Sequence, residues 1–103
     1  MPKIVINRCY GGFSVSEAVY QELGLEWDGY GYLDNDLMGY QDPRDFYDYR
    51  EDPKLVAIVE KLGPAASGDL AYLGVVTVPD DIDWTIDDYD GIETVYERHR
   101  VWS

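Results

Sequence analysis

The chain has 103 residues, of which 46% are hydrophobic and 15% aromatic. This composition is typical of one globular domain with its own core and excludes a disordered acidic tail. Twenty-one Asp and Glu residues stand against eight Lys and Arg residues, which gives a formal net charge of -13. The charge argues against a protein that binds nucleic acid or an anionic membrane surface, because both attractions depend on basic residues.

The cysteine count and the hydropathy pattern narrow the class further. Cys9 is the single cysteine, so an internal disulfide bond and a metal site made only of cysteines are excluded. No stretch approaches the roughly 20 apolar residues of a membrane span. The apolar run that follows Lys3 is too short for the core of a signal peptide. We therefore expect a cytoplasmic protein.

The N-terminal part of the chain predicts a strand, a turn and a helix. Residues 3–8 are rich in β-branched side chains, which favours a buried strand. A Gly-Gly pair then interrupts the run. Ser14 begins a Ser-x-x-Glu sequence, the pattern of a capping box at a helix start. We expect a helix over residues 15–23 that ends at Gly24, because glycine readily adopts the left-handed conformation of a helix terminator.

A Tyr- and Gly-rich segment without helical periodicity occupies about residues 26–48. The pattern predicts a long aromatic loop, with short strands near residues 45–50. A long irregular segment in a small domain is usually functional or flexible, and the alternative is a loop whose rings cover the core. We expect residues 1–103 to form one domain that carries this segment as an insertion.

The second half of the chain begins with a clear helix signal. Asp52-Pro53 combines a capping residue with proline at the first helical position. Apolar residues then recur at helical spacing up to Gly63-Pro64, which ends the helix.

Three strands are predicted after this helix. They cover residues 70–78, residues 84–86 and a return strand from residue 92 to about residue 102, and Asp90-Gly91 is a typical hairpin turn between the last two. The predicted fold class is therefore α+β, a small single domain with a mostly antiparallel sheet and two helices.

The strand-to-helix turn is the first candidate site. The N-terminus of a helix presents unpaired N–H groups that favour an anion. The glycines Gly11 and Gly12 would let a ligand approach the backbone, and Arg8 would add a charged, forked contact. The alternative is that the two glycines only make a tight turn.

The few basic residues extend this candidate. Arg98-His99-Arg100 is the one basic cluster, and with Arg50 and the aromatic rings it would build a pocket that grips phosphate and stacks a base. The alternative is that the arginines pair with carboxylates at the surface. The candidate ligand-binding residues are Asn7, Arg8, Tyr10, Gly11, Gly12, Phe13, Ser14, Arg50, His99, Arg100 and Trp102.

Catalytic and metal sites are less favoured. A phosphatase-type loop would need an arginine at position 15, where the chain has Val15. A Cys9–His99 pair would make a nucleophile and a base, but no spacing brings the two residues together. Asp34-Asn35-Asp36 begins like a calcium loop and then places Met38 at a ligand position. We predict no catalytic residue, no metal and no cofactor.

Several stretches resemble a family of small phage-encoded proteins that are mostly uncharacterised. The opening run is Lys3-Ile4-Val5-Ile6-Asn7-Arg8-Cys9-Tyr10-Gly11-Gly12-Phe13-Ser14, and the resemblance continues at residues 50–56, 60–63, 76–84, 89–92 and 99–102. It covers most of the chain outside residues 26–48. The resemblance implies a phage accessory protein that acts in the host bacterial cytoplasm, and small proteins of this kind often counter host defence.

Two functions follow as expectations. The first is non-catalytic capture of a phosphate-bearing small molecule, such as a cyclic-nucleotide host defence signal, by a homo-oligomer whose subunits enclose the ligand. The alternative is an acidic protein–protein interaction module, or a DNA mimic that occupies the basic groove of a host enzyme. A small hydrolase that uses Cys9 or His99 is a third possibility.

Overall fold

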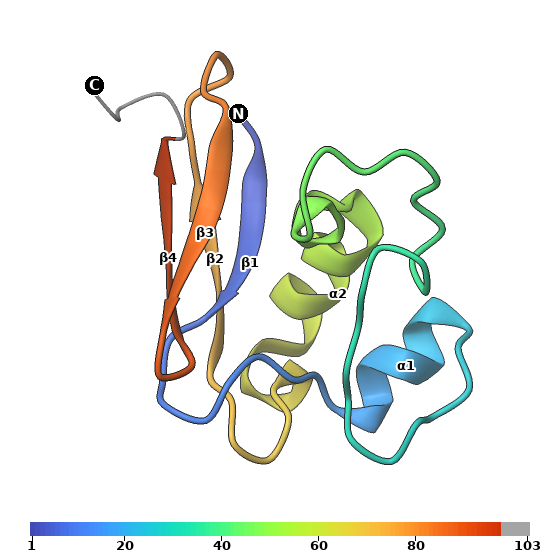
Figure 1. Ribbon diagram of the computed structural model, residues 1–103. Coiled ribbons are helices and arrows are strands. Elements are labelled where there is room, and N and C mark those ends of the chain that lie inside the picture. Colours follow the sequence, from blue (N-terminus) through green and yellow to red (C-terminus); the bar gives the residue numbers. More distant parts are fainter. Residues whose placement is uncertain (98–103) are drawn as a thin grey trace.

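The computed structural model describes residues 1–97, with the strands on one side of the molecule and the helices on the other (Figure 1). The elements in chain order are β1 (Lys3–Asn7), α1 (Glu17–Leu23), the 3₁₀ helix η1 (Asp48–Glu51), α2 (Pro53–Leu62), the 3₁₀ helix η2 (Gly63–Ala66), β2 (Leu73–Thr77), β3 (Trp84–Tyr89) and β4 (Ile92–Glu97). The predicted α+β class and the predicted order of strands and helices are confirmed.

The strands form two separate antiparallel pairs. β1 pairs with β2 in a register that runs from Lys3 opposite Thr77 to Asn7 opposite Leu73. β3 pairs with β4, and the turn between them consists of Asp90 and Gly91, both with positive φ. Positive φ at both central residues is the requirement of a type I′ hairpin turn, so the Asp-Gly turn is confirmed. The return strand is described as far as Glu97, and its predicted end at about residue 102 lies outside the described residues.

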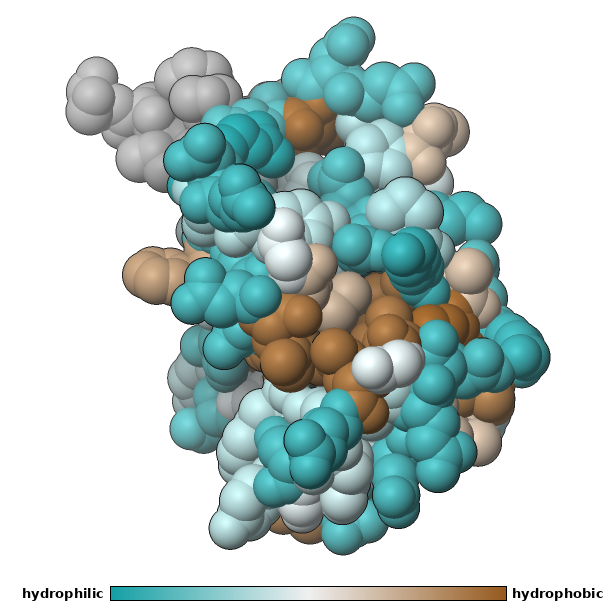
Figure 2. Space-filling model, turned by 90° about the vertical axis from the view of Figure 1, so that its right-hand side faces the viewer, coloured by the Kyte–Doolittle hydropathy of each residue, from teal (hydrophilic) through white to brown (hydrophobic). Residues whose placement is uncertain are grey.

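β1 contributes to two hydrophobic clusters because its side chains alternate. Val5 packs in the larger cluster with the buried residues of α1 and α2, whereas Ile4 and Ile6 pack with Trp84 and Ile86 of the β3–β4 hairpin. Several side chains at the border of the larger cluster are only partly buried. Figure 2 looks onto the side of the molecule that carries the helices and shows a hydrophobic area there, surrounded by hydrophilic side chains.

The start of α1 differs from the prediction. The N-cap residue is Ser16, without a side-chain capping bond, and the helix begins at Glu17. Ser14 stays extended because Val15 bridges to Ser67 and donates its N–H to the carbonyl oxygen of Gly31 at 2.8 Å. The predicted capping box at Ser14 is therefore wrong. The predicted terminator is confirmed, since Gly24 has a left-handed φ of 74°.

The helix signal at Asp52-Pro53 is confirmed. Pro53 is the first residue of α2, and the side chain of Asp52 accepts the backbone N–H of Lys54 at 2.8 Å. No helix within residues 1–97 is long and apolar enough to cross a membrane.

The Tyr- and Gly-rich segment lies on the helical side of the molecule and is fixed to the core. Its Asp28 carboxylate accepts the backbone N–H groups of Tyr30 and Gly31 at 2.7 and 2.6 Å, and Trp27 packs edge-on against Tyr20. The predicted strands near residues 45–50 are wrong, because the chain there turns into η1.

Candidate functional site

The Gly-Gly turn packs closely against two other backbone segments. Gly11 and Gly12 have φ values of 121° and 87°. A Cβ atom on Gly11 would lie 2.4 Å from the carbonyl oxygen of Leu70, and one on Gly91 would lie 2.3 Å from the backbone nitrogen of Gly12. The glycines therefore allow three chain segments to meet, which accounts for them without a ligand. Moreover, α1 is only seven residues long, and Glu17 in its first turn would repel an anionic ligand at this helix end.

Asn7 holds these segments together. It is fully buried, and its side-chain amide donates to the carbonyl oxygens of Cys9 and Gly91 at 2.7 and 2.6 Å. Its side-chain oxygen accepts the backbone N–H of Tyr72 at 2.8 Å. The thiol of Cys9 donates to the carbonyl oxygen of Leu70 at 3.3 Å. Both side chains are thus engaged in internal contacts.

Arg50 forms a buried ion pair with Glu93. The two residues are 2% and 4% exposed, and the guanidinium donates to both carboxylate oxygens, from Nη1 at 2.6 Å and from Nη2 at 2.8 Å. Nη1 also donates to the carbonyl oxygen of Val5 at 3.1 Å, and the same carboxylate accepts the backbone N–H of Asn7 at 2.8 Å. The pair therefore satisfies polar groups of β1 and joins β1, η1 and β4.

Aromatic rings enclose the Arg50 guanidinium. It lies 3.5 Å from the ring centroid of Phe13 and within 5.4 Å of the rings of Tyr47 and Tyr49. Burial by itself would lower the pKa of Arg50, but hydrogen bonding to Glu93 and the nearby negative charge raise the pKa above its ordinary value. Arg50 is thus a charged group whose contacts are all inside the fold.

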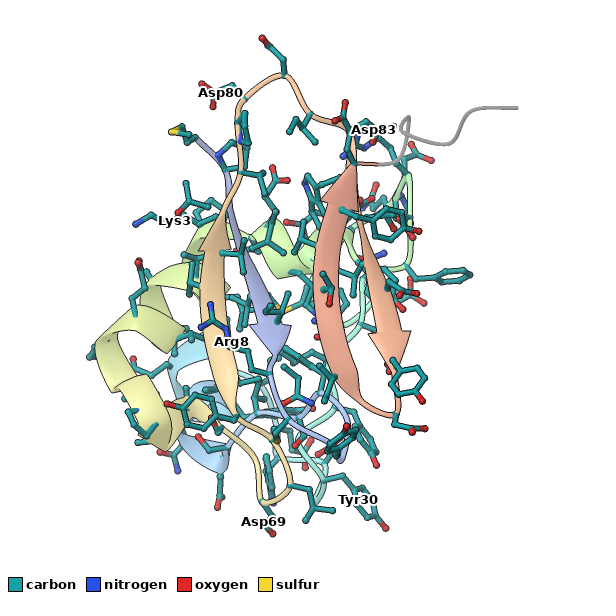
Figure 3. The ribbon with its side chains drawn as sticks, turned by 90° about the vertical axis from the view of Figure 1, so that its left-hand side faces the viewer. Lys3, Arg8, Tyr30, Asp69, Asp80 and Asp83 are labelled. Carbon is teal, nitrogen blue, oxygen red and sulfur yellow. The ribbon has the colours of Figure 1, made fainter. Side chains whose placement is uncertain are left out.

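Arg8 lies apart from Arg50. Its side chain is exposed and crosses Gly74 on β2, where a Cβ atom would be 2.4 Å from Nε of Arg8 (Figure 3). Nη2 donates to the carbonyl oxygen of Val75 at 3.5 Å, a long hydrogen bond. Arg50, in contrast, bonds the carbonyl oxygen of Val5, which points away from β2. The two arginines therefore lie on opposite sides of the β1–β2 pair.

The structure brings Asn7 and Phe13 together with Arg50 in the interior, and the other predicted site residues do not join them. Tyr10 is 66% exposed, Ser14 is buried with its carbonyl oxygen bonded to Gly68, and Phe13 packs on Arg50. The predicted contributions of His99, Arg100 and Trp102 lie outside the described residues. Residues 1–97 therefore do not bring the predicted arginines into one pocket.

Carboxylates form part of the lining of two hollows in the described surface, and Arg44 also lines the first of them. One of about 590 Å³ lies within the Tyr- and Gly-rich segment, and one of about 480 Å³ beside it shares Asp34 and Asp36. The second hollow also has Glu26 and Asp28 in its wall. The pKa of Asp28 is lowered because backbone N–H groups, that of Gly31 first, bond its carboxylate. The second hollow, whose wall has four carboxylates and no cation among the described residues, therefore repels a phosphate group and attracts a cation.

Most carboxylates of the chain are exposed, and they cover the molecule on several sides. They are Glu17, Glu22, Glu26, Asp28, Asp34, Asp36, Asp42, Glu60, Asp69, Asp80, Asp81, Asp87, Asp88 and Asp90. In the part of the chain that the structure describes, Lys3, Arg44 and Lys61 pair at the surface with Glu60, Asp83 and Glu22, respectively. The surface therefore keeps a large excess of negative charge.

Sequence reasoning missed Glu93 as the partner of Arg50. The one signal was a glutamate inside the predicted strand, and because Ile92-Glu93-Thr94-Val95-Tyr96-Glu97 does not alternate strictly between apolar and polar residues, its pattern does not distinguish a buried carboxylate from an exposed one. No protein-family model matches the chain, and no curated protein or solved structure matches it either.

Proposed function

We propose that this protein is a non-catalytic interaction module that binds a basic surface of a host protein, as a phage accessory protein in the bacterial cytoplasm would. The observation that carries the proposal is the state of Arg50. The phosphate hypothesis needs this arginine at a ligand, but its guanidinium is buried on Glu93. The described surface is dominated by negative charge and exposed aromatic side chains, and Arg8 is an exposed cation among them.

The physical basis is electrostatic complementarity. A net charge of -13 on 103 residues produces a field that accelerates the approach of a basic partner and repels acidic ones. A groove that normally holds nucleic acid is the kind of basic surface that such a protein fits, because carboxylates then take the place of phosphates. The proposal therefore includes inhibition of a host nucleic-acid enzyme by occupation of its groove.

A salt-dependent pull-down tests the proposal. The tagged protein is expected to retain a basic protein from bacterial lysate at low salt, to release it at high salt and to lose it to competing duplex DNA. A variant with Glu17→Gln, Glu26→Gln, Asp81→Asn and Asp87→Asn should bind the retained protein about three- to tenfold more weakly, because four exposed charges are removed. Gln21→Ser with Gln41→Ser, which changes exposed neutral residues, is the control. Retention of no basic protein, or retention that does not respond to salt, would refute the proposal.

Capture of a phosphate-bearing signal is the second candidate, and Arg8 favours it. Within residues 1–97 this exposed arginine forms no ion pair. Its backbone N–H donates to the carbonyl oxygen of Tyr72, whose ring is exposed beside it. Calorimetry with cyclic di- and trinucleotides and with cyclic ADP-ribose variants should then give dissociation constants below about 1 mM. Arg8→Ala should abolish the binding, and Arg44→Ala, at an exposed arginine elsewhere, should leave it unchanged. If none of these nucleotides binds in that range, the candidate is abandoned.

A further inference from the structure

Four large apolar side chains are exposed around the place where the Gly-Gly turn meets the β3–β4 turn. Tyr10 is 66% exposed, Leu70 69%, Tyr72 59% and Tyr89 71%. The loops that carry them lie at the lower end of the molecule in Figure 1. We call these four residues the tyrosine face.

The segments behind the tyrosine face are in direct contact. The N–H of Gly11 bonds the carbonyl oxygen of Asp90 at 3.4 Å, which joins the residues after Tyr10 and Tyr89. A Cβ atom on Gly11 would lie 3.0 Å from the Cβ of Leu70. The N–H of Tyr72 bonds the buried side chain of Asn7, which also bonds the β3–β4 turn. The four side chains therefore project from one frame, which lowers the entropy that a partner must overcome on binding.

Within residues 1–97, no ring–ring or cation–π contact involves the three tyrosine rings of this face. Tyr30 stacks on Tyr32 at 5.7 Å and Trp27 packs on Tyr20, whereas the exposed rings of Phe46 and Tyr96 also lack a ring partner in this range but are not part of this group. Exposed apolar side chains that gather in one place on a soluble domain mark an interaction surface. Tyrosine is enriched at such surfaces because it combines a large apolar ring with a hydroxyl group.

The charges around the face indicate what it binds. Asp69, Asp88 and Asp90 are exposed in the same loops and at the same turn, and Figure 3 shows Asp69 at this end of the molecule. They outnumber the exposed Arg8, whose backbone N–H bonds the carbonyl oxygen of Tyr72, so the charge beside the face is negative in sum. A cationic side chain gains from a tyrosine ring and from a neighbouring carboxylate at once. A second copy of this chain would instead bring like charges together. We propose that the tyrosine face is the surface on which an arginine-rich protein segment docks, an inference that rests on the proposed function and adds its location.

Two variants with identical chemistry test the location. Tyr10→Ser with Tyr89→Ser removes half of the face, and Tyr30→Ser with Tyr32→Ser removes two tyrosines of similar exposure, 71% and 62%, from the Tyr- and Gly-rich segment. Neither change alters the net charge. The probe is a synthetic peptide of alternating arginine and serine, titrated at low salt and followed by calorimetry. We expect the first variant to bind the peptide about five- to thirtyfold more weakly and the second to bind like the unchanged protein.

The outcomes separate the two proposals. If both variants bind the peptide as tightly as the unchanged protein, or if only the Tyr30/Tyr32 variant binds more weakly, the location is wrong and the proposed function stands. If the unchanged protein binds no basic peptide and retains no basic protein, the proposed function fails and the location fails with it. Sedimentation supplies a further outcome. A dimer that the Tyr10/Tyr89 variant converts to a monomer would assign the face to a second copy and overturn the arginine-rich partner.

Discussion

An Arg50→Met variant is expected to lose about 3–5 kcal/mol of the free energy of unfolding. The substitution replaces arginine with an unbranched apolar side chain and leaves the Glu93 carboxylate, which is 4% exposed, without its cation. It also leaves the carbonyl oxygen of Val5 without the Nη1 donor. Because a domain of this size has about 5–15 kcal/mol in all, the loss is a large fraction of its stability. Urea-induced unfolding followed by circular dichroism measures it.

Two further variants make the interpretation specific. Lys3→Met breaks the exposed ion pair with Glu60 and should cost less than about 1 kcal/mol. The double variant Arg50→Met, Glu93→Leu removes both buried charges and should recover part of the loss, because the backbone N–H of Asn7 and the carbonyl oxygen of Val5 still lack their partners. If Arg50→Met alone is no more destabilising than Lys3→Met, the buried pair does not hold the two sheets together as the structure indicates.

The second large effect is expected for Gly31→Ala, at about 3 kcal/mol or more. A Cβ atom at this position would lie 2.0 Å from the carbonyl oxygen of Val15 and 3.1 Å from its backbone nitrogen. The Val15 nitrogen donates to the carbonyl oxygen of Gly31. The added methyl group would therefore push apart the two residues that this hydrogen bond joins. The φ of +89° adds left-handed strain. Thermal and urea unfolding both report the change.

Gly29→Ala is the matched control, because Gly29 has nearly the same φ, +88°, and no atom within 4 Å of its added Cβ. It should cost only the left-handed strain of about 1–2 kcal/mol. The difference between the two variants therefore measures how tightly the Tyr- and Gly-rich segment packs on Val15. Equal losses would mean that the segment yields to the new side chain and is not fixed to the core.

Features that depend on neighbouring residues could be predicted from the sequence. Asp52-Pro53 starts α2, Gly24 ends α1, and Asp90-Gly91 makes the hairpin turn, since in each case the local residue chemistry determines the backbone conformation. The β-branched run that became β1 belongs to the same class.

Features that depend on distant residues were missed. Ser14 and Ser16 are both good caps locally, and the bridge from Val15 to Ser67 decides between them. The sequence likewise indicates that Arg50 is one of few cations, but not that its partner is a glutamate 43 residues further along the chain. The candidate phosphate site combined local signals whose spatial relation only the fold determines.

The pairing of the strands also has a consequence for synthesis of the chain on the ribosome. β3 and β4 are joined by a two-residue turn, whereas β1 pairs with a strand that begins at Leu73. The pairing of β1 with β2 has to close the loop from Asn7 to Leu73, and closing so long a loop slows folding. The apolar side chains of Ile4, Val5 and Ile6 therefore stay without their strand partner until β2 has emerged from the ribosome. The carboxylate that completes the β1 contacts, Glu93, is synthesised later still, so the buried Arg50–Glu93 pair cannot form until β4 has emerged from the ribosome.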